Sequence, residues 1–515
     1  MIFSTPAARV VRAVICLGLV ATLTSVVAAK EQPSGKPRMY APASQALPPN
    51  GGKVATPPAT YPVDLPTALR LADANNPTVG VARARVRQAV AQLDRARLAW
   101  IPNLVLGPTF FYHGGVDQNR RGDIFTVSRG NYTLGVGPTI RVDVSEALYL
   151  PLVARQHVQA ADSTARATSN NIQLDVAVAY LDLVELHGLM AINADITDRT
   201  EQILRSAFLG AKAGLNKTAA DLNRAATELQ LRREEGKVLR GRIDAAAARL
   251  GRLLLLDPSV ELTPFEIAVV PVILVPGEYP LEQLIQTALR ARPEITVATA
   301  GVAAADALAR QAKMAPLLPR VQADFIAGGL SGSRNDMTFS SLGSQYNTGV
   351  AIVWNFDNFG LGNAATNRAR RANQDAARYQ LQETQALVAS QVVEAAQTAA
   401  ARFEALDPAQ EAVRQAQEMY RKFRESSFGV VGPKAQFDAL EPLTAVQALN
   451  AARVQYLQQV VEFNRAQFRL FTAIGQPSLC GLENGVVHSV DVPAIPSTPA
   501  LPAPKANPEA APGRE

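Results

Sequence analysis

Residues 132–143, YTLGVGPTIRVD, lead directly into a helical run from Ser145 to Ala213 that contains a single proline, Pro151. Alternate positions of the quoted stretch are apolar, and the positions between them are polar or small; the apolar ones are Leu134, Val136, Pro138, Ile140 and Val142. Alternation of this kind predicts a β-strand with one apolar face. A length of about ten residues with this pattern is typical of a transmembrane barrel strand, with lipid outside and water inside. A strand of a soluble β-sandwich is the alternative.

The same arrangement occurs a second time in the chain. Residues 346–356, YNTGVAIVWNF, alternate in the same way and precede a second long helical run, residues 361–428. Pro102 comes before the first strand region, and Pro319 stands at the corresponding place before the second. A pattern that recurs at a fixed separation indicates a duplicated unit. We expect the first repeat at residues 61–278 and the second at 279–485.

Each repeat contains two predicted strands joined by a polar, glycine-containing loop. The strands are expected at residues 104–112, 132–143, 321–327 and 346–356, and the loops at 113–131 and 328–345. Four strands cannot close a barrel in lipid, because open edges are intolerable in hydrocarbon. Other subunits therefore have to complete it. The aromatic residues near the strand ends are expected at the membrane interface; they are Tyr132, Tyr346, Trp354 and Phe356.

Long helical hairpins follow the strands, at residues 145–255 and 361–475. At 1.5 Å per residue, the first helix of each hairpin is about 100 Å long. The last helix has two apolar seams at heptad-like spacing, one through Leu443 and Leu457 and one through Val446 and Val460. Two seams indicate a helix packed between two neighbours, as in a wall of helices. A plain long helical bundle is the alternative.

Both ends of the chain have the composition of segments outside the folded part. Residues 1–29 combine basic residues, a short apolar run and small residues, which predicts a secretory signal peptide. A retained membrane anchor is the alternative, although the apolar run is short for a span. The proline-rich residues 30–60 and 486–515 are expected to be a disordered linker and tail, because such segments cannot bury enough apolar area to fold.

Composition argues against several classes of function. Once the leader is removed, Cys480 is the remaining cysteine, which excludes an internal disulfide and a cysteine-based metal cluster. The four histidines show no pair at metal-ligand spacing, and no phosphate-binding loop is present. The net charge of +6 is spread along helical faces rather than gathered into a nucleic-acid-binding patch. We therefore predict no enzyme activity, no cofactor, no metal and no nucleic-acid partner.

The order of elements is helix, strand, loop, strand, long helix and returning helix, and this order occurs twice. Over residues 61–480 it resembles that of the TolC-like outer-membrane efflux proteins. The resemblance implies a mainly α fold with a small β part, in which three subunits build a 12-stranded transmembrane β-barrel and a long α-helical barrel. It also implies a homotrimer in the outer membrane with a long periplasmic extension. The implied partners are a periplasmic membrane-fusion adaptor and an inner-membrane pump of the RND or ABC type.

The turn before the last helix carries the strongest local match to that family. The family has a Val-Gly followed six residues later by an aspartate, and Val431, Gly432 and Asp438 keep this spacing here. Pro433 stiffens the turn and departs from the pattern. In the first repeat, the stretch from Gly214 to Asp221 is one residue longer, so the match there is looser.

The resemblance implies that these turns form the gate at the periplasmic end. Asp438 and Glu441 fall on the family's acidic constriction, with glutamate in place of the usual second aspartate, and Lys434 falls on its basic neighbour; Asp221 would be the equivalent in the first repeat. Residues three apart share one face of a helix, and a ring of such carboxylates attracts cations. Helix capping by Asp438, and ordinary solvated charge at Glu441 and Lys434, are the alternatives.

The expected function is therefore a passive exit duct for small molecules or proteins, driven by an inner-membrane pump. A periplasmic coiled-coil scaffold or envelope-tethering protein is the competing interpretation, which the four amphipathic strands argue against.

Overall fold

The computed structural model describes residues 60–212, 219–257, 260–265, 269–333, 342–428, 440–478 and 488–489. The predicted signal peptide, nearly all of the predicted linker and most of the predicted tail lie outside these residues.

Helices account for most of the described chain. The α-helices are α2 (Leu65–Asn75), α3 (Pro77–Arg97), α4 (Val144–Lys212), α5 (Ala219–Leu254), α6 (Leu281–Ala291), α7 (Pro293–Met314), α8 (Leu361–Glu404), α9 (Leu406–Phe428) and α10 (Leu440–Ala473). Short 3-10 turns are η1 (Leu98–Trp100), η2 (Ala315–Leu317) and η3 (Asp357–Gly360). The strands are β1 (Thr60–Val63), β2 (Asn103–Gln118), β3 (Ile124–Asp143), β4 (Glu261–Pro264), β5 (Val272–Ile273), β6 (Arg320–Ser333), β7 (Gly343–Val353) and β8 (His488–Ser489).

Local sequence fixes where the shorter helices begin. Asn76 ends α2 and caps α3, because its side-chain oxygen accepts a hydrogen bond from the backbone N–H of Thr78 at 2.9 Å. Pro77 then occupies the first helical position, where its missing N–H costs nothing. The amide group of Asn76 also donates to the carbonyl of Leu253 at 3.0 Å, so the same side chain ties this corner to α5.

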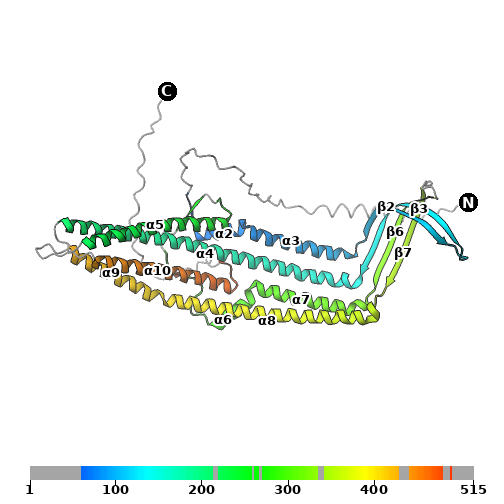
Figure 1. Ribbon diagram of the computed structural model, residues 1–515. Coiled ribbons are helices and arrows are strands. Elements are labelled where there is room, and N and C mark those ends of the chain that lie inside the picture. Colours follow the sequence, from blue (N-terminus) through cyan, green and yellow to red (C-terminus); the bar gives the residue numbers. More distant parts are fainter. Residues whose placement is uncertain are drawn as a thin grey trace, which may run out of the picture. The chain divides into compact units, whose positions relative to one another are not determined.

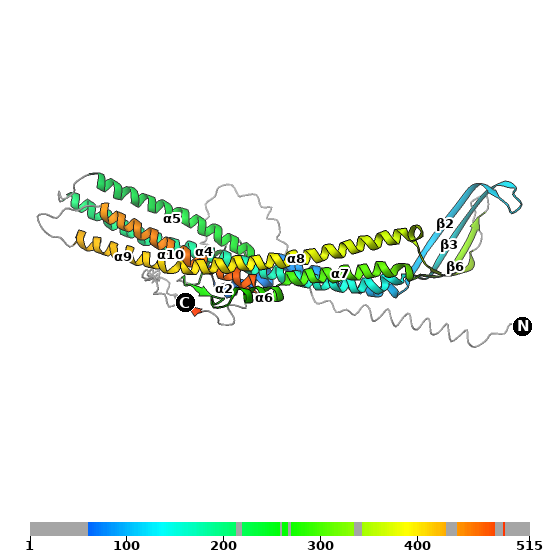
Figure 2. The same cartoon turned by 90° about the horizontal axis from the view of Figure 1, so that it is seen from below.

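The long helices lie side by side as a wall (Figures 1 and 2). α4 contacts α3 and α7 in the half nearer the strands, and α5 and α10 in the other half. α8 packs against α7 and α10, and α9 packs against α10. The order across the wall is therefore α3, α4, α7, α8 beside the sheet and α5, α4, α10, α9 at the far end.

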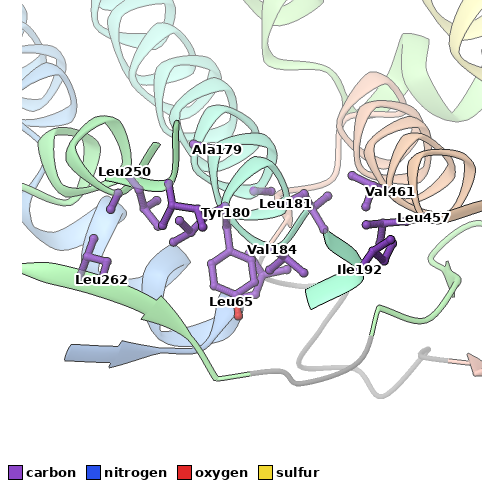
Figure 3. Packing of buried hydrophobic residues seen from close by; sticks show 14 of the residues in the cluster. Leu65, Ala179, Tyr180, Leu181, Val184, Ile192, Leu250, Leu262, Leu457 and Val461 are labelled. Atoms are coloured by element: carbon purple, nitrogen blue, oxygen red, sulfur yellow. The ribbon is translucent and has the colours of Figure 1, made fainter. Parts of the chain in front are cut away.

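The largest hydrophobic core lies where α2, α4, α5 and α10 meet (Figure 3). Tyr180 of α4 is buried there, and its hydroxyl donates to the carbonyl of Val63 in β1 at 3.2 Å. β1 pairs with β4 in parallel, so this small sheet covers one side of the core. The sequence patterns did not predict β1, β4 or β5.

The predicted two-sided packing of the last helix is confirmed. Leu443 and Leu457 on one seam of α10 belong to the core shared with α4. Val460 and Phe463 on the other seam pack with Leu406 of α9. Because α10 contacts both α4 and α9, it lies between two neighbours, as the seams indicated.

The predicted long helix of the second repeat is divided. α8 ends at Glu404 and α9 begins at Leu406, so the chain bends at Ala405. Pro408 explains the position, because a proline removes one helical hydrogen bond and its ring clashes with the carbonyl four residues before it, that of Glu404. Pro151 lies within α4, which continues through it from Val144 to Lys212.

The four-stranded sheet has the order β2-β3-β6-β7 and is antiparallel throughout. The prediction of four strands is confirmed, but the predicted loop at residues 113–131 is wrong. β2 and β3 pair without interruption from Asn103 opposite Thr139 to Gln118 opposite Ile124, leaving a turn of a few residues. Asn119 closes that turn, since its side-chain oxygen accepts from the backbone N–H of Asp123 at 3.0 Å.

The second hairpin is also longer than predicted at its outer end. β6 extends to Ser333 and β7 begins at Gly343, so both ends of the predicted loop 328–345 are strand; residues 334–341 lie outside the described residues. The predicted strand 346–356 instead ends at Val353, because the chain turns into η3. Pairing across the ladder outweighs the low strand propensity of the glycines in these segments.

One part of the predicted tail is wrong. His488 and Ser489 form β8, which pairs with β5 through Ile273 and Val272.

Candidate functional site

The sheet has one mainly apolar face, as the alternation predicted. The register brings the alternating apolar positions of all four strands onto this face, and many of these side chains are exposed, including Leu106 (72%) and Tyr346 (76%). The other face is mixed, because Val105, Phe111, Leu330 and Val353 are exposed there among polar and small residues. Exposed apolar residues on this face are Leu104, Leu106, Phe110, Tyr112, Leu134, Val136, Phe325, Tyr346, Val350 and Ile352. Residues on the opposite face include Thr109, Asn131, Thr133, Arg141, Gln322, Asp324 and Asn347. An apolar surface of this size indicates contact with lipid or protein.

The two outer strands of the sheet leave its edges open. In the described part of a single chain, β2 pairs with β3 alone and β7 with β6 alone. Backbone N–H and C=O groups on such edges need partners, and in lipid each unsatisfied group costs several kcal/mol. The apolar face and the open edges together indicate that the sheet pairs with further strands.

An ion pair fixes the junction between the sheet and the helical wall. Asp143, the last residue of β3, accepts hydrogen bonds from the backbone N–H of Ser145 at 3.0 Å and from the Ser145 hydroxyl at 2.7 Å. Its other oxygen accepts from Nε of Arg320, the first residue of β6, at 2.8 Å. One carboxylate thus caps the start of α4 and joins it to the neighbouring strand.

The four predicted interface aromatics lie at different levels of the sheet. Tyr132 is half-buried and opposite Phe110, and Tyr346 is exposed in β7. Trp354 and Phe356 are exposed just beyond β7, and the indole N–H of Trp354 donates to the carbonyl of Leu317 at 3.4 Å. Their role at a membrane interface stays a prediction.

Buried charges join α10 to α4 in the half far from the sheet. Arg465 donates to Glu185 at 2.7 Å and to Asp182, and on its own helix it pairs with Glu462. Burial by itself would lower the pKa of Arg465, but the carboxylates of Glu185 and Asp182 outweigh it, and the pKa is raised. Sequence reasoning missed this cluster; its signal is the pair of Glu462 and Arg465, three residues apart in the last helix.

A second group of charges lies about three turns further along the same helices. Asp195 accepts from Arg199 at 2.8 Å and from Arg453 of α10, and Arg199 lies 4.7 Å from the ring centroid of Tyr420 in α9. Burial tends to raise the pKa of Asp195, but its bonds to Arg199 and Arg453 outweigh burial and lower it. The stability that this carboxylate contributes is therefore present above the ordinary aspartate pKa and is lost as the pH falls through the lowered value.

The predicted gate falls largely outside the described residues. Glu441 is exposed in the first turn of α10. Asp221 belongs to α5, but its side chain is not described. The remaining predicted gate and turn residues lie outside the described ranges: Gly214, Val431, Gly432, Pro433, Lys434 and Asp438.

The described residues contain no group of three or more histidine, cysteine, aspartate or glutamate side chains placed to hold a metal ion.

Across the helices that the structure describes, none combines the length and the apolar character needed to span a membrane.

Comparison with known proteins gives a consistent picture. Residues 68–254 and 284–476, more than half of the chain, match the family described as outer membrane efflux protein. Comparison with curated protein sequences gives no significant match.

Solved channel structures share the fold. The CmeC outer membrane channel of Campylobacter jejuni has a TM-score of 0.66 and 16% identity, covering 80% of this chain and 85% of that one. VceC of Vibrio cholerae has a TM-score of 0.64 and 17% identity, covering 80% and 96%. The open state of the MtrE channel of Neisseria gonorrhoeae has a TM-score of 0.62 and 16% identity, covering 80% and 89%.

Both repeats are matched, and the helical wall and four-stranded sheet have the fold of the solved outer-membrane channels. The chain therefore belongs to the outer membrane efflux protein family, as an outer-membrane channel subunit with long periplasmic helices.

Proposed function

We propose that three copies of this chain form a passive exit duct through which small molecules or proteins leave the periplasm. An inner-membrane pump of the RND or ABC type supplies the energy, and a periplasmic membrane-fusion adaptor connects it to the duct. The observation that carries the proposal is the two-faced sheet with open edges, which a single chain cannot satisfy in lipid.

The helical wall supports the same arrangement. Its outer members are α3 and α8 beside the sheet, and α5 and α9 at the far end. Exposed apolar side chains remain on these outer helices, among them Val81 and Val90 of α3 and Tyr379 and Leu387 of α8. Three copies placed edge to edge would cover such residues and enclose a tunnel. If the protein were a periplasmic scaffold, the apolar face of the sheet would have no function.

The assembly can be tested on the purified protein. In detergent, light scattering should give a homotrimer, far-UV circular dichroism should be dominated by helix, and the trimer should conduct ions in planar bilayers. Co-purification with an adaptor would identify the export system. A stable monomer that still conducts ions would contradict the proposal, and a soluble elongated protein without detergent would support the scaffold.

We also place the periplasmic constriction of this duct at Asp438 and Glu441, with Lys434 beside them. Replacing both acids by alanine should weaken cation selectivity and reduce block by multivalent cations, because a ring of carboxylates attracts cations. The trimer should stay intact, since neither residue belongs to an apolar seam. Lys434→Ala should raise conductance, because the remaining acids repel one another more strongly.

Single-channel recordings in planar bilayers measure all three effects. Glu411→Ala is the matched control, because Glu411 is an exposed acid of α9 in an i,i+3 pair with Arg414. Unchanged selectivity and block in the double alanine variant would put the constriction elsewhere.

A further inference from the structure

The open edges of the sheet are β2 and β7. Because the chain is duplicated, they correspond to β6 and β3, which pair with each other inside the chain. Resting on the proposed trimer, we infer that β7 of one copy pairs antiparallel with β2 of the next, with Val353 opposite Gly107 and Gly343 opposite Asp117. The register of this contact between copies follows from the pairing inside one chain.

The two hairpins can be aligned residue by residue. Leu104 stands two residues after Pro102, and Val321 stands two residues after Pro319, so these strand positions correspond. Leu104 is opposite Pro138, and Val321 is opposite Ile352, so Pro138 of β3 corresponds to Ile352 of β7.

The internal contact between the hairpins then predicts the external one. Inside the chain, β3 pairs with β6 so that Val136 lies opposite Ala327. Val136 corresponds to Val350, and Ala327 corresponds to Phe110. Val350 of one copy therefore lies opposite Phe110 of the next, and every residue of β7 meets a residue within β2.

Side-chain size supports this register independently. The inferred register sets Tyr346 opposite Gly114, and Phe111 opposite Gly349, so each large residue faces a glycine across the edge. A shift by two residues would place Tyr346 against Tyr112 or against Val116 instead.

The sheet faces and the prolines also agree. In the inferred register, Val350 and Ile352 continue the apolar face of the next copy's β2, and Asn347 meets His113 on the polar face. Each ladder has a proline at the same rung: the internal ladder is interrupted at Pro138, and the external one has Pro108 opposite Ile352. The interruption is thus a repeated feature of the unit.

The turn η3 supplies a further contact at this edge. Asp357 corresponds to Asp143, but α4 follows Asp143 directly, whereas Asn358, Phe359 and Gly360 intervene before α8. All three residues have left-handed backbone angles, with φ values of 51°, 56° and 89°. This conformation is unfavourable for a bulky side chain, and Phe359 is fully exposed in the single chain.

The inferred register gives Phe359 a partner. β7 ends at Val353, which lies opposite Gly107 of the next copy, so the chain that continues from Val353 into η3 runs toward the segment just before β2. Leu98 and Ile101 in that segment are exposed apolar residues. Phe359 packs on them, and this burial offsets the unfavourable backbone conformation.

Cysteine cross-linking tests the register in a background in which Cys16 and Cys480 are serine. Two adjacent rungs are needed, because hydrogen-bonded and non-hydrogen-bonded pairs alternate and differ in Cα separation. The pairs are Val350→Cys with Phe110→Cys, and Ala351→Cys with Thr109→Cys. At least one should give a covalent trimer on oxidation, seen on a denaturing, non-reducing gel.

The matched control pairs are displaced by two residues: Val350→Cys with Tyr112→Cys, and Ala351→Cys with Phe111→Cys. Diagonal positions are too far apart for a disulfide, so these should stay uncross-linked. Cross-linking of the controls, or of no pair in a protein that light scattering shows to be trimeric, overturns the register and leaves the trimer standing. A monomer in detergent overturns the proposed function itself.

Phe359→Ser tests the contact made by η3. It should abolish the heat-resistant trimer at temperatures at which the parent protein keeps it, whereas Phe265→Ser, which removes an exposed aromatic away from the sheet edge, should not. Equal trimer stability in the two variants would exclude Phe359 from the interface and favour its insertion into lipid.

Discussion

Replacing Arg465 by alanine is expected to lower the free energy of unfolding of the helical wall by about 3–5 kcal/mol per chain. The side chain of Arg465 is 10% exposed and faces Asp182 and Glu185 of α4 as well as Glu462 of its own helix. Removing the cation leaves three carboxylates close together in a poorly solvated place. Asp182 keeps an ion pair with Arg249 at 3.6 Å, so the cost comes mainly from repulsion among the acids and from the loss of the partner of Glu185 and Glu462, and less from the lost attraction.

Arg421→Ala is the matched control for this prediction. Arg421 pairs with Glu418 at 2.6 Å, a distance like that between Arg465 and Glu185, but its side chain is 60% exposed. Exposed ion pairs contribute about 0–1 kcal/mol, because water solvates both partners when the pair is broken. The contrast between the two variants therefore isolates the effect of burial.

Thermal unfolding followed by circular dichroism measures both variants. The apparent midpoint should fall markedly for Arg465→Ala and little for Arg421→Ala. Adding Asp182→Asn and Glu185→Gln to Arg465→Ala should recover part of the loss, because the repelling charges are removed. Equal midpoints for the two single variants would show that the cluster is solvated and weakly coupled.

Periodicity predicted the parts of this molecule in which one rule applies over many residues. The alternation at Leu134, Val136 and Ile140 placed a strand and its apolar face correctly, because a period of two admits one orientation of the sheet. The seams through Leu457 and Val460 placed α10 between two neighbours for the same reason. The family of the chain was also predicted from this order of elements.

The sequence patterns did not predict features that depend on single contacts. The glycines and charges at Gly114, Gly115 and Asp117 suggested a loop, but pairing with β3 makes them strand. β5 has two residues and no periodicity; Asn464 of α10 holds it, because the Asn464 side chain accepts from the N–H of Val272 at 2.8 Å. Contacts between residues almost two hundred positions apart leave no local signal.

Some parts of the candidate site could be predicted from the sequence and others could not, for a physical reason. The membrane-facing sheet follows from alternation, which is a property of the chain itself. The gate at Asp438 and Glu441 rests on the spacing within one turn, and spacing cannot distinguish a constriction from a helix cap. The buried cluster at Arg465 depends on which helix faces α10, so the sequence offers Glu462 as a partner on the same helix and does not show Asp182 or Glu185.

Gly137→Ala should prevent the sheet from assembling, with an expected cost of about 3 kcal/mol or more. A Cβ atom at Gly137 would lie 1.7 Å from the carbonyl oxygen of Phe325 in β6 and 2.8 Å from the Cα of Ile326. These are backbone atoms, so no side chain can move aside. β3 and β6 would have to separate at the place where the two repeats join.

Gly328→Ala should have the same consequence, because its Cβ would lie 1.9 Å from the carbonyl oxygen of Leu134. Gly332→Ala is the matched control: it lies in the same strand, and a Cβ there has nothing within 4 Å. The measurement is the yield of heat-resistant trimer from the outer-membrane fraction, which should be near zero for the first two variants and normal for the third. Normal trimer from Gly137→Ala would mean that β3 and β6 lie further apart than their pairing indicates. Because this contact joins the two halves of the duplicated chain, its loss would leave two hairpins that cannot contribute to one barrel.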